Sequence, residues 1–361
     1  RKSPSPNAAR SPSGDAHYYL AFDKRRPYQE IRQVSARFVS EIGFQSYPDG
    51  RTIDEFTEPS DRSPYSEVML RHQKSHDGNQ ILETYLEREF RVPARFDAYV
   101  YATQSLNATI TAASVEHFRR QTGTCMGYLA WQLNDCWPAV SWSGVDYGGR
   151  WKAQQYSLKR AFTPVMISSI LDDNRVRLYV NNDTPGRARL QIDWSLLDGS
   201  NQIVTSGATE VEVPSQSVAC VLDDDFADHV SGGENGFYLT YSAFEDGIEK
   251  SAGLLLFCAP KHYCFDKPGL EISVADRGDH FELSLLTDTL IFALALELKD
   301  CDATFSDNYF HLVPGRNRTI TLQKSALSRP LDAAEIAESL IWMSAFDLQV
   351  ESAETASAAV Q

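Results

Sequence analysis

Residues 36–44 have the sequence Ala-Arg-Phe-Val-Ser-Glu-Ile-Gly-Phe, an apolar run that is broken by one carboxylate and one glycine. Such a run predicts a buried strand that ends near Glu41, followed by a turn at Pro48-Asp49-Gly50. A buried carboxylate is costly, and in α/β barrels the carboxyl ends of the strands hold the active site. Glu41 is therefore a candidate catalytic residue. The alternatives are an exposed glutamate at a strand end or an ion pair with Arg37.

A second buried strand is expected over residues 126–133, Met-Gly-Tyr-Leu-Ala-Trp-Gln-Leu. At its end the sequence places Trp131, Asn134, Asp135 and Trp137. Aromatic faces beside amide and carboxylate groups suit a sugar, whose C–H face stacks on the ring while its hydroxyls form hydrogen bonds. A tryptophan-rich core strand followed by a turn would give the same pattern, so both interpretations stay open.

The segments around these strands have helical patterns. Helices are expected from Ser66 to about His76, with Gly78 after the end, and from about Phe96 to Arg120. A further helix is expected over residues 150–161. This order of strands and helices is typical of a parallel sheet or barrel. A complete barrel takes about 250 residues, and only residues 1–163 have this character, so most of the barrel is expected to precede Arg1.

From Pro164 onward the apolar residues alternate with a period of two, which predicts antiparallel strands. The first series lies at residues 175–180, 188–194, 209–213 and 236–241. A second series lies at residues 270–274, 280–286, 291–298 and 319–322. Two β-sandwich domains are therefore expected, over residues 164–262 and 263–361. In the tail, a helix is expected from Leu331 to about Met343, and the last ten residues are expected to be frayed.

Charge and composition exclude several classes of function. The chain of 361 residues has a net charge of −15, which argues against nucleic-acid binding and against adhesion to anionic membranes. No apolar run is long enough for a transmembrane helix. The six cysteines lack CxxC spacing, so we expect buried thiols and neither a metal nor a cofactor. A soluble enzyme with a neutral substrate fits this composition, but the compartment and the oligomeric state are not assigned.

Four sequence elements resemble those of the β-mannosidases of glycoside hydrolase family two. Residues 37–46 are similar to the strand that carries the nucleophile, R-F-x-S-E-F-G-x-Q-S. Residues 128–152 are similar to the last barrel strand and helix, L-Y-W-Q-L-N-D-x-W-P, S-W and Y-x-G-R-W-K. Residues 14–19 resemble G-D-x-H-Y-W, and residues 71–79 resemble R-x-x-H-x-x-G-x-N. Residues 305–315 resemble a signature of the final sandwich domain of the family more weakly.

The resemblance implies the C-terminal portion of a (β/α)8 TIM barrel, followed by two immunoglobulin-like β-sandwich domains. It implies a retaining exo-β-mannosidase that removes terminal β-D-mannose from the non-reducing ends of manno-oligosaccharides, with Glu41 as the nucleophile. The acid/base of the family is a Glu after an Asn on an upstream strand. No Asn-Glu pair precedes Glu41 in this sequence, so the chain alone is expected to be inactive.

The resemblance also implies contacts with the sugar. The pocket for the terminal mannose is expected to be lined by Trp131, Asn134, Asp135 and Trp137, with Asp15 and His17 at its rim. Asp135 could instead orient other residues, and His17 could be a structural, hydrogen-bonded histidine. Tyr19 and Ile42 stand where the family usually has Trp and Phe.

Two other functions stay open at this point. One is a related family-two enzyme with a different sugar specificity, such as a β-galactosidase or a β-glucuronidase. The other is a non-enzymatic carbohydrate-binding role for the two sandwiches alone. In every case the expected partner is a small oligosaccharide, and no nucleic acid or membrane is involved.

Overall fold

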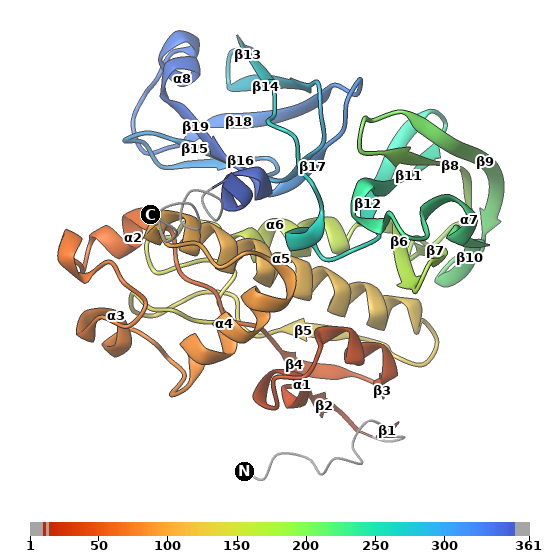
Figure 1. Ribbon diagram of the computed structural model, residues 1–361, viewed down its shortest axis with the longest axis horizontal. Helices are drawn as coiled ribbons and strands as arrows, with labels where there is room; N and C mark the ends of the chain where they lie inside the picture. Colours follow the sequence, from red (N-terminus) through yellow and green to blue (C-terminus); the bar gives the residue numbers. More distant parts are fainter. Residues whose placement is uncertain (1–9, 12–13, 351–361) are drawn as a thin grey trace. The chain divides into compact units, whose positions relative to one another are not determined.

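The computed structural model describes residues 10–11 and 14–350 (Figure 1). The chain divides into two compact units, and each unit is assembled from segments that are separated in sequence. The first unit comprises residues 1–44, 109–131 and 157–264, and the second comprises residues 45–108, 132–156 and 265–361. The end of the chain that we expect to be frayed lies outside the described residues.

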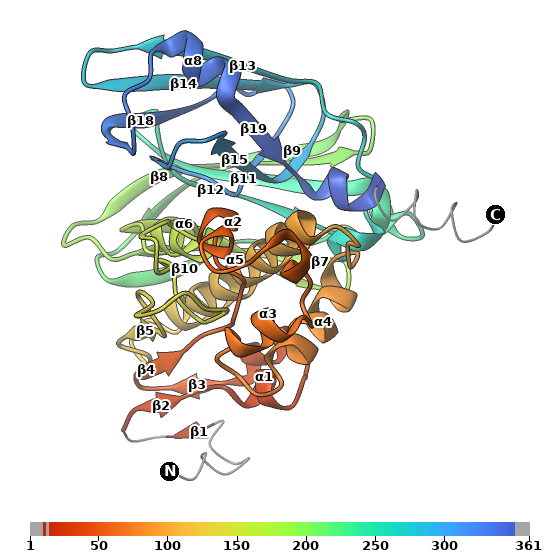
Figure 2. The same ribbon diagram turned by 90° about the vertical axis from the view of Figure 1, so that its left-hand side faces the viewer.

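A short parallel sheet in the first unit carries the candidate nucleophile. Its strands are β2 (Ala16–His17), β4 (Val39–Ile42) and β5 (Tyr128–Ala130), in the order β2-β4-β5 (Figure 2). A separate parallel pair is formed by β1 (Arg10–Ser11) and β3 (Ser35–Ala36). Both expected strands exist but are shorter than predicted. The strand β4 ends one residue after Glu41, as its apolar pattern indicates.

The long helix α5 (Phe96–Arg120) has the bounds that its apolar spacing predicts. The helix predicted after Ser66 is only α3 (Glu67–Arg71), and the Ser66 hydroxyl caps it by accepting from the Met69 N–H at 3.2 Å. Residue Gly78 does not follow that helix but begins another, α4 (Gly78–Glu89). A Cβ atom there would lie 2.4 Å from Gln45 Oε1, so close packing rather than a helix stop explains this glycine.

The remaining helices before the sandwiches are short. The turn predicted at Pro48-Asp49-Gly50 is the start of α2 (Gly50–Asp54), because the Asp49 side chain caps it by accepting from the Arg51 N–H. The predicted helix over residues 150–161 is α6 (Ala153–Ala161). The other short elements are α1 (Leu20–Asp23), η2 (Tyr28–Gln33) and η3 (Pro59–Asp61).

A β-sandwich completes the first unit. One sheet contains β6 (Val165–Asp172), β7 (Arg175–Asn182) and β10 (Ser217–Asp225). The other contains β8 (Ala188–Asp198), β9 (Ile203–Val213), β11 (Phe237–Glu245) and β12 (Ile248–Leu256). Alternate residues of β7, such as Val176, Leu178 and Val180, enter a core shared by both sheets. The connections include α7 (Ala227–Val230), η4 (Glu234–Gly236) and η5 (Pro260–His262).

A second sandwich ends the described chain, within the second unit (Figure 1). One sheet contains β13 (Leu270–Asp276), β14 (His280–Thr287), β16 (Ala303–Phe305) and β18 (Arg318–Leu327). The other contains β15 (Ile291–Leu298), β17 (Phe310–Leu312) and β19 (Leu340–Met343). The helix predicted from Leu331 to Met343 is only α8 (Ala333–Ser339). The prediction is wrong for its last four residues, because they pair with β15 as a strand.

The cysteines differ from expectation. The structure contains them as free thiols, of which Cys125 and Cys301 are buried as predicted, whereas Cys136, Cys220 and Cys264 are exposed. Cys258 is half-buried. The prediction of buried thiols is therefore wrong for the exposed residues. In residues 14–350, no helix is both long enough and apolar enough to cross a membrane.

Candidate active site

The carboxylate of Glu41 is held by two polar side chains of the first unit. Its Oε1 atom accepts a hydrogen bond of 3.1 Å from the Tyr19 hydroxyl, and its Oε2 atom lies 3.3 Å from His17 Nδ1. The side chain is 28% exposed, so solvent or a ligand can reach it. The carboxylate is therefore oriented at the end of a parallel strand without being sealed inside the protein.

His17 lies between two carboxylates. Its Nδ1 atom faces Glu41, and its Nε2 atom lies 3.7 Å from Asp15 Oδ2. The Asp15 carboxylate also accepts a hydrogen bond of 2.5 Å from the Ser40 hydroxyl, and this bond lowers the pKa of Asp15. Since Ser40 precedes Glu41 on β4, the strand positions both ends of this polar group. The structure thus brings together Asp15, His17 and Glu41.

The sequence pattern did not predict that Tyr19 donates a hydrogen bond to Glu41. Its ring is partly buried, and burial together with the Glu41 carboxylate raises the pKa of the phenol far above its ordinary value. The phenol therefore stays neutral and acts as a hydrogen-bond donor at physiological pH. The sequence offered one indication of this role, because Tyr19 stands where the family that the chain resembles usually has Trp, and a tyrosine has a hydroxyl that can donate to a carboxylate.

Trp131 continues the sheet beside Glu41. Its backbone N–H donates to the Ile42 carbonyl at 2.7 Å, immediately after β5. The Trp131 side chain is 44% exposed, which leaves the indole accessible for stacking. In the first unit, an accessible aromatic ring therefore directly follows the strand that neighbours the strand of the accessible carboxylate.

Asp135, in the second unit, has the opposite character. Its carboxylate is fully buried and accepts hydrogen bonds from Lys74 Nζ at 2.5 Å, Ser141 Oγ at 2.7 Å and Ser143 Oγ at 2.5 Å. These donors occupy both carboxylate oxygens, so the geometry favours the orienting role over direct contact with a sugar hydroxyl. Sequence reasoning missed Lys74 as the partner.

Trp137 and Asn134, also in the second unit, are exposed. The Lys74 ammonium lies 5.8 Å from the centroid of the Trp137 ring. The ring of His72 stacks on Phe56 at 3.8 Å and lies 5.3 Å from Trp137. His72 is fixed further because its Nδ1 atom lies 2.6 Å from the Pro138 carbonyl oxygen. These contacts give Trp137 a defined orientation, and 36% of the residue stays exposed.

Lys152 is a buried cation that sequence reasoning also missed. Its Nζ atom donates to the carbonyl oxygens of Ser46 at 3.0 Å and Ser141 at 3.2 Å. Ser46 and Ser141 also exchange backbone hydrogen bonds with each other. Burial lowers the pKa of Lys152 to about 8. The amine therefore ties together two backbone segments, and its position in the motif Arg150-Trp151-Lys152 could have signalled this role.

Residues 14–350 contain no cluster of three or more His, Cys, Asp or Glu side chains with the arrangement of a metal site. The polar groups around Glu41 are instead arranged as hydrogen-bond donors to carboxylates. Such an arrangement is suited to holding a carboxylate in the orientation needed for attack on an electrophilic carbon.

Comparison with known proteins identifies the sandwiches first. Residues 174–262 match the family model of a mannosidase Ig/CBM-like domain, and residues 265–348 match that of an Ig-fold domain of mannosidases. The chain is 27% identical over 344 residues to a β-mannosidase of Capra hircus, covering 88% of the chain and 38% of the relative. It is 28% identical over 330 residues to β-mannosidase B of Aspergillus niger, covering 85% and 39%.

These matches support a resemblance of the chain to the C-terminal region of the family-two β-mannosidases. The chain spans about two fifths of the length of these two relatives. The β-mannosidase B of Emericella nidulans is 36% identical over 159 residues, which cover 43% of the chain and 19% of that relative.

The fold agrees with this relationship. The structure of a β-D-mannosidase from Dictyoglomus thermophilum superposes with a TM-score of 0.84 at 22% identity, covering 92% of the chain and 40% of that protein. The exo-chitosanase CsxA of Amycolatopsis orientalis superposes with a TM-score of 0.66 at 15% identity, covering 85% and 42%. The fold of the chain is therefore similar both to a β-D-mannosidase and to an exo-chitosanase.

Proposed function

We propose that this chain is part of a retaining exo-β-mannosidase, a glycoside hydrolase that releases terminal β-D-mannose from the non-reducing ends of β-mannosides. One observation carries the proposal. Glu41 is oriented by Tyr19 and His17 at the carboxyl end of a parallel strand, in a sequence element that resembles the nucleophile strand of β-mannosidases. The names of the relatives support mannose as the sugar.

In the proposed reaction, the Glu41 carboxylate attacks C1 of the terminal mannose and the bond from C1 to the leaving oxygen breaks. A covalent mannosyl-enzyme forms, and the leaving oxygen takes a proton from a second carboxylic acid. Water then attacks C1, gives a proton to that second group and frees Glu41. The two carboxyl groups are expected about 5–5.5 Å apart. We propose that residues outside this chain supply the second group.

We also propose that residues 1–163 belong to a (β/α)8 barrel and that the two sandwiches span residues 164–262 and 263–361. The sheet β2-β4-β5 supports this, because its three parallel strands leave β2 and β5 as edges within the described residues. A closed barrel has no edges. The side chains of Met126 and Leu129, next to and on β5, are 71% and 53% exposed, as expected of a surface that further barrel strands cover.

The proposed sugar contacts differ between residues. Trp131 is accessible and lies on the sheet of Glu41, so we propose that it stacks on the mannose ring. We propose that Asp15 and His17 orient Glu41 and border the sugar. For Asn134 and Trp137 sugar binding stays a prediction, and we propose that Asp135 orients its neighbours instead.

The proposal is tested on the full-length polypeptide that contains this chain, with a panel of 4-nitrophenyl glycosides. The β-mannoside is expected to be hydrolysed, and a 2-fluoro mannoside is expected to label Glu41. Hydrolysis of the β-galactoside or β-glucuronide but not of the β-mannoside would sink the assignment of the sugar. Sugar binding without hydrolysis, unaffected by Glu41→Gln, would favour a carbohydrate-binding role. The chain of 361 residues alone is expected to be inactive.

A further inference from the structure

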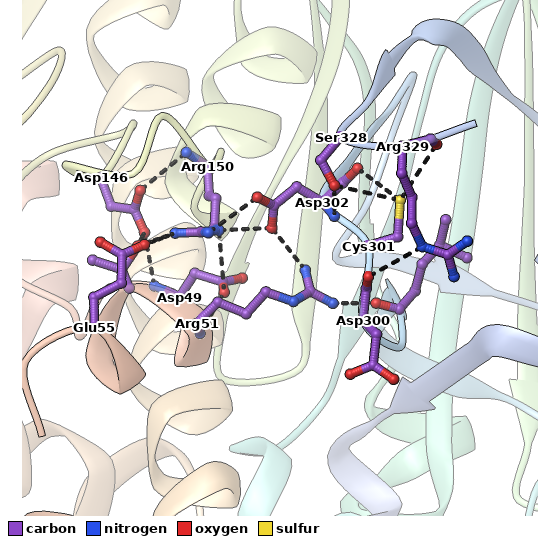
Figure 3. Close-up of polar contacts among 12 residues, drawn as sticks. Asp49, Arg51, Glu55, Asp146, Arg150, Asp300, Cys301, Asp302, Ser328 and Arg329 are labelled. Atoms are coloured by element: carbon purple, nitrogen blue, oxygen red, sulfur yellow. Dashed lines mark hydrogen bonds and ion pairs between the residues drawn. The ribbon is translucent and has the colours of Figure 1, made fainter. Parts of the chain in front are cut away.

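A single carboxylate of the last sandwich binds two arginines of the second unit, Arg51 of α2 and Arg150 of the loop before α6 (Figure 3). Asp302, between β15 and β16, accepts from Arg150 through Nε at 2.8 Å and Nη2 at 3.0 Å, and from Arg51 Nη1 at 3.1 Å. Arg51 Nη2 also donates to the Leu298 carbonyl. The two-pronged contact with Arg150 fixes both the distance and the plane of the guanidinium. Asp302 is thus the shared acceptor of two cations.

The other side of the Arg150 guanidinium is bound to α2. Its Nη1 atom donates to Thr52 Oγ1 at 2.7 Å. The same atom donates to Glu55 Oε1 at 3.0 Å (Figure 3). The Arg150 side chain is mostly buried between these acceptors and Asp302. Because its partners surround it on two sides, the guanidinium has one well-defined position.

The backbone of Arg150 is held by a buried carboxylate. Asp146 Oδ1 accepts from the Arg150 N–H at 3.0 Å, and Asp146 Oδ2 accepts from the Thr52 hydroxyl at 2.7 Å and from the Asp49 N–H at 3.1 Å. Residues 146–150 therefore form a closed loop that is attached to the start of α2. Its shape depends on Arg150 and Asp146 together.

Two glycines allow this loop to close. A Cβ atom on Gly148 would lie 2.1 Å from Arg150 Nη1, so any side chain there would displace the guanidinium. Gly149 has a φ angle of +83°, which L-residues rarely adopt. The two glycines therefore leave room for the Arg150 guanidinium and allow the backbone turn that the loop needs.

The loop continues directly into the buried Lys152. Two residues after Arg150, Lys152 donates its N–H to the Gly144 carbonyl at 2.9 Å and its Nζ protons to the Ser46 and Ser141 carbonyls. Ser141 donates its hydroxyl to Asp135, which binds Lys74. Polar contacts at both ends of residues 150–152 therefore connect Asp302, through this short piece of backbone, to the segment that carries Asn134 and Trp137.

We propose that Asp302 is a positioning residue of the glycosidase: through Arg150 it fixes the loop of residues 144–152, and this loop orients the segment of residues 132–141. The last sandwich then serves as a support of the catalytic part. This inference rests on the proposed function, because the segment it orients is a predicted sugar-binding segment. A purely structural role of this network would change the stability of the protein and leave the rate of the reaction unchanged.

The test compares Asp302→Asn with Asp276→Asn in the full-length polypeptide. Asp276 is a matched control, because it accepts from Lys324 Nζ at 2.8 Å in the same sandwich and is exposed. The assay is made at a temperature well below that at which either variant unfolds. We expect Asp302→Asn to lower kcat/KM for 4-nitrophenyl β-mannoside about tenfold and Asp276→Asn to leave it unchanged. Backbone amides of residues 146–150 are expected to exchange with deuterium faster in Asp302→Asn alone.

The double variant Asp302→Asn with Arg150→Gln tests whether the effect of Asp302 on kcat/KM is transmitted through Arg150. It is expected to have the kcat/KM of Arg150→Gln alone, since both changes interrupt one series of contacts. Fully additive losses would overturn the inference, and so would wild-type kcat/KM and wild-type exchange in Asp302→Asn.

A separate outcome concerns the proposed function. If the wild-type polypeptide hydrolyses no β-mannoside, that function is wrong, and the exchange measurement still tests the attachment of the loop. Faster exchange of residues 146–150 in Asp302→Asn would then support the attachment, and unchanged exchange would refute it.

Discussion

The hydroxyl of Tyr19 donates a hydrogen bond of 3.1 Å to the carboxylate of Glu41. Glu41 lies on β4, Tyr19 follows the neighbouring strand β2 by two residues, and His17 approaches the other carboxylate oxygen at 3.3 Å. The carboxylate is therefore oriented from both sides before any substrate binds. Orientation of this kind is a large part of what a nucleophile gains from its protein environment.

Replacing Tyr19 by Phe is expected to lower kcat on a β-mannoside about tenfold, because Glu41 loses the donor that orients it. The matched control is Tyr65→Phe, which removes a tyrosine hydroxyl that donates to the Glu83 carboxylate at 2.6 Å on the protein surface. The control is expected to retain the wild-type kcat. Equal kcat for both variants and the wild type would show that the Tyr19 hydroxyl has no part in the reaction.

Glu41→Ala is expected to abolish most of kcat while the protein stays folded, because the covalent intermediate can no longer form. Added azide or formate is expected to restore part of the activity, since a small anion fits the space of the missing carboxylate. Rates with and without azide provide the measurement. Near-normal activity of Glu41→Ala without any anion is the result that contradicts the assignment of the nucleophile.

Asp135→Asn is expected to destabilise the protein by about 3–5 kcal/mol, because Lys74 loses its buried counter-charge. Asp97→Asn is the control, since the Arg95–Asp97 ion pair is exposed. The control is expected to change stability by less than about 1 kcal/mol. Thermal unfolding of both variants measures the difference, and similar melting temperatures would mean that the buried carboxylate is not needed for folding.

Lys152 predicts a specific pH dependence of stability. Burial lowers its pKa from an ordinary value of 10.5 to about 8 in the folded chain. Between these values the unfolded chain binds one more proton than the folded chain, so this group makes stability rise with pH from about 8 to about 10.5. Its contribution over that window is on the order of 2–3 kcal/mol.

The variant Lys152→Met is expected to lack this contribution. The stability of the wild type relative to Lys152→Met should therefore increase between pH 8 and pH 10, as measured by melting temperatures at each pH. The exposed Lys24→Met is the matched control for the loss of one lysine side chain. A stability difference between the wild type and Lys152→Met that does not change with pH would mean that the buried amine keeps an ordinary pKa.

The sequence predicted the elements whose apolar pattern is unambiguous. The spacing from Phe96 to Arg120 defines α5 to the residue, and the alternation in β7 and β8 predicts their strands. It missed β6, whose first four residues are all buried, and β12, whose Lys, Ser and Gly residues hide the alternation. It also missed α4, because Gly78 resembles a helix stop.

The polar partners of the site could be predicted only in part. A carboxylate at the end of a predicted buried strand made Glu41 a candidate, and the resemblance to the nucleophile strand of β-mannosidases selected it over an exposed or ion-paired glutamate. No rule of spacing connects Lys74 with Asp135, or Arg150 with Asp302, since these pairs are separated by 61 and 152 residues. Such pairs depend on how distant segments meet, and one sequence carries no direct record of that.

The interleaving of the two compact units along the chain constrains how the protein can be made. Residues 45–108 belong to a unit that is completed only by residues 265–361. During synthesis, which proceeds at about 5–20 residues per second, the early segment must wait many seconds on the ribosome before its last partner emerges. Apolar side chains that pack on the last segment, such as Tyr101 against Tyr309, stay uncovered for that time, so expression at low temperature with abundant chaperones is expected to raise the yield. For the same reason, neither unit can be excised or exchanged with a single cut.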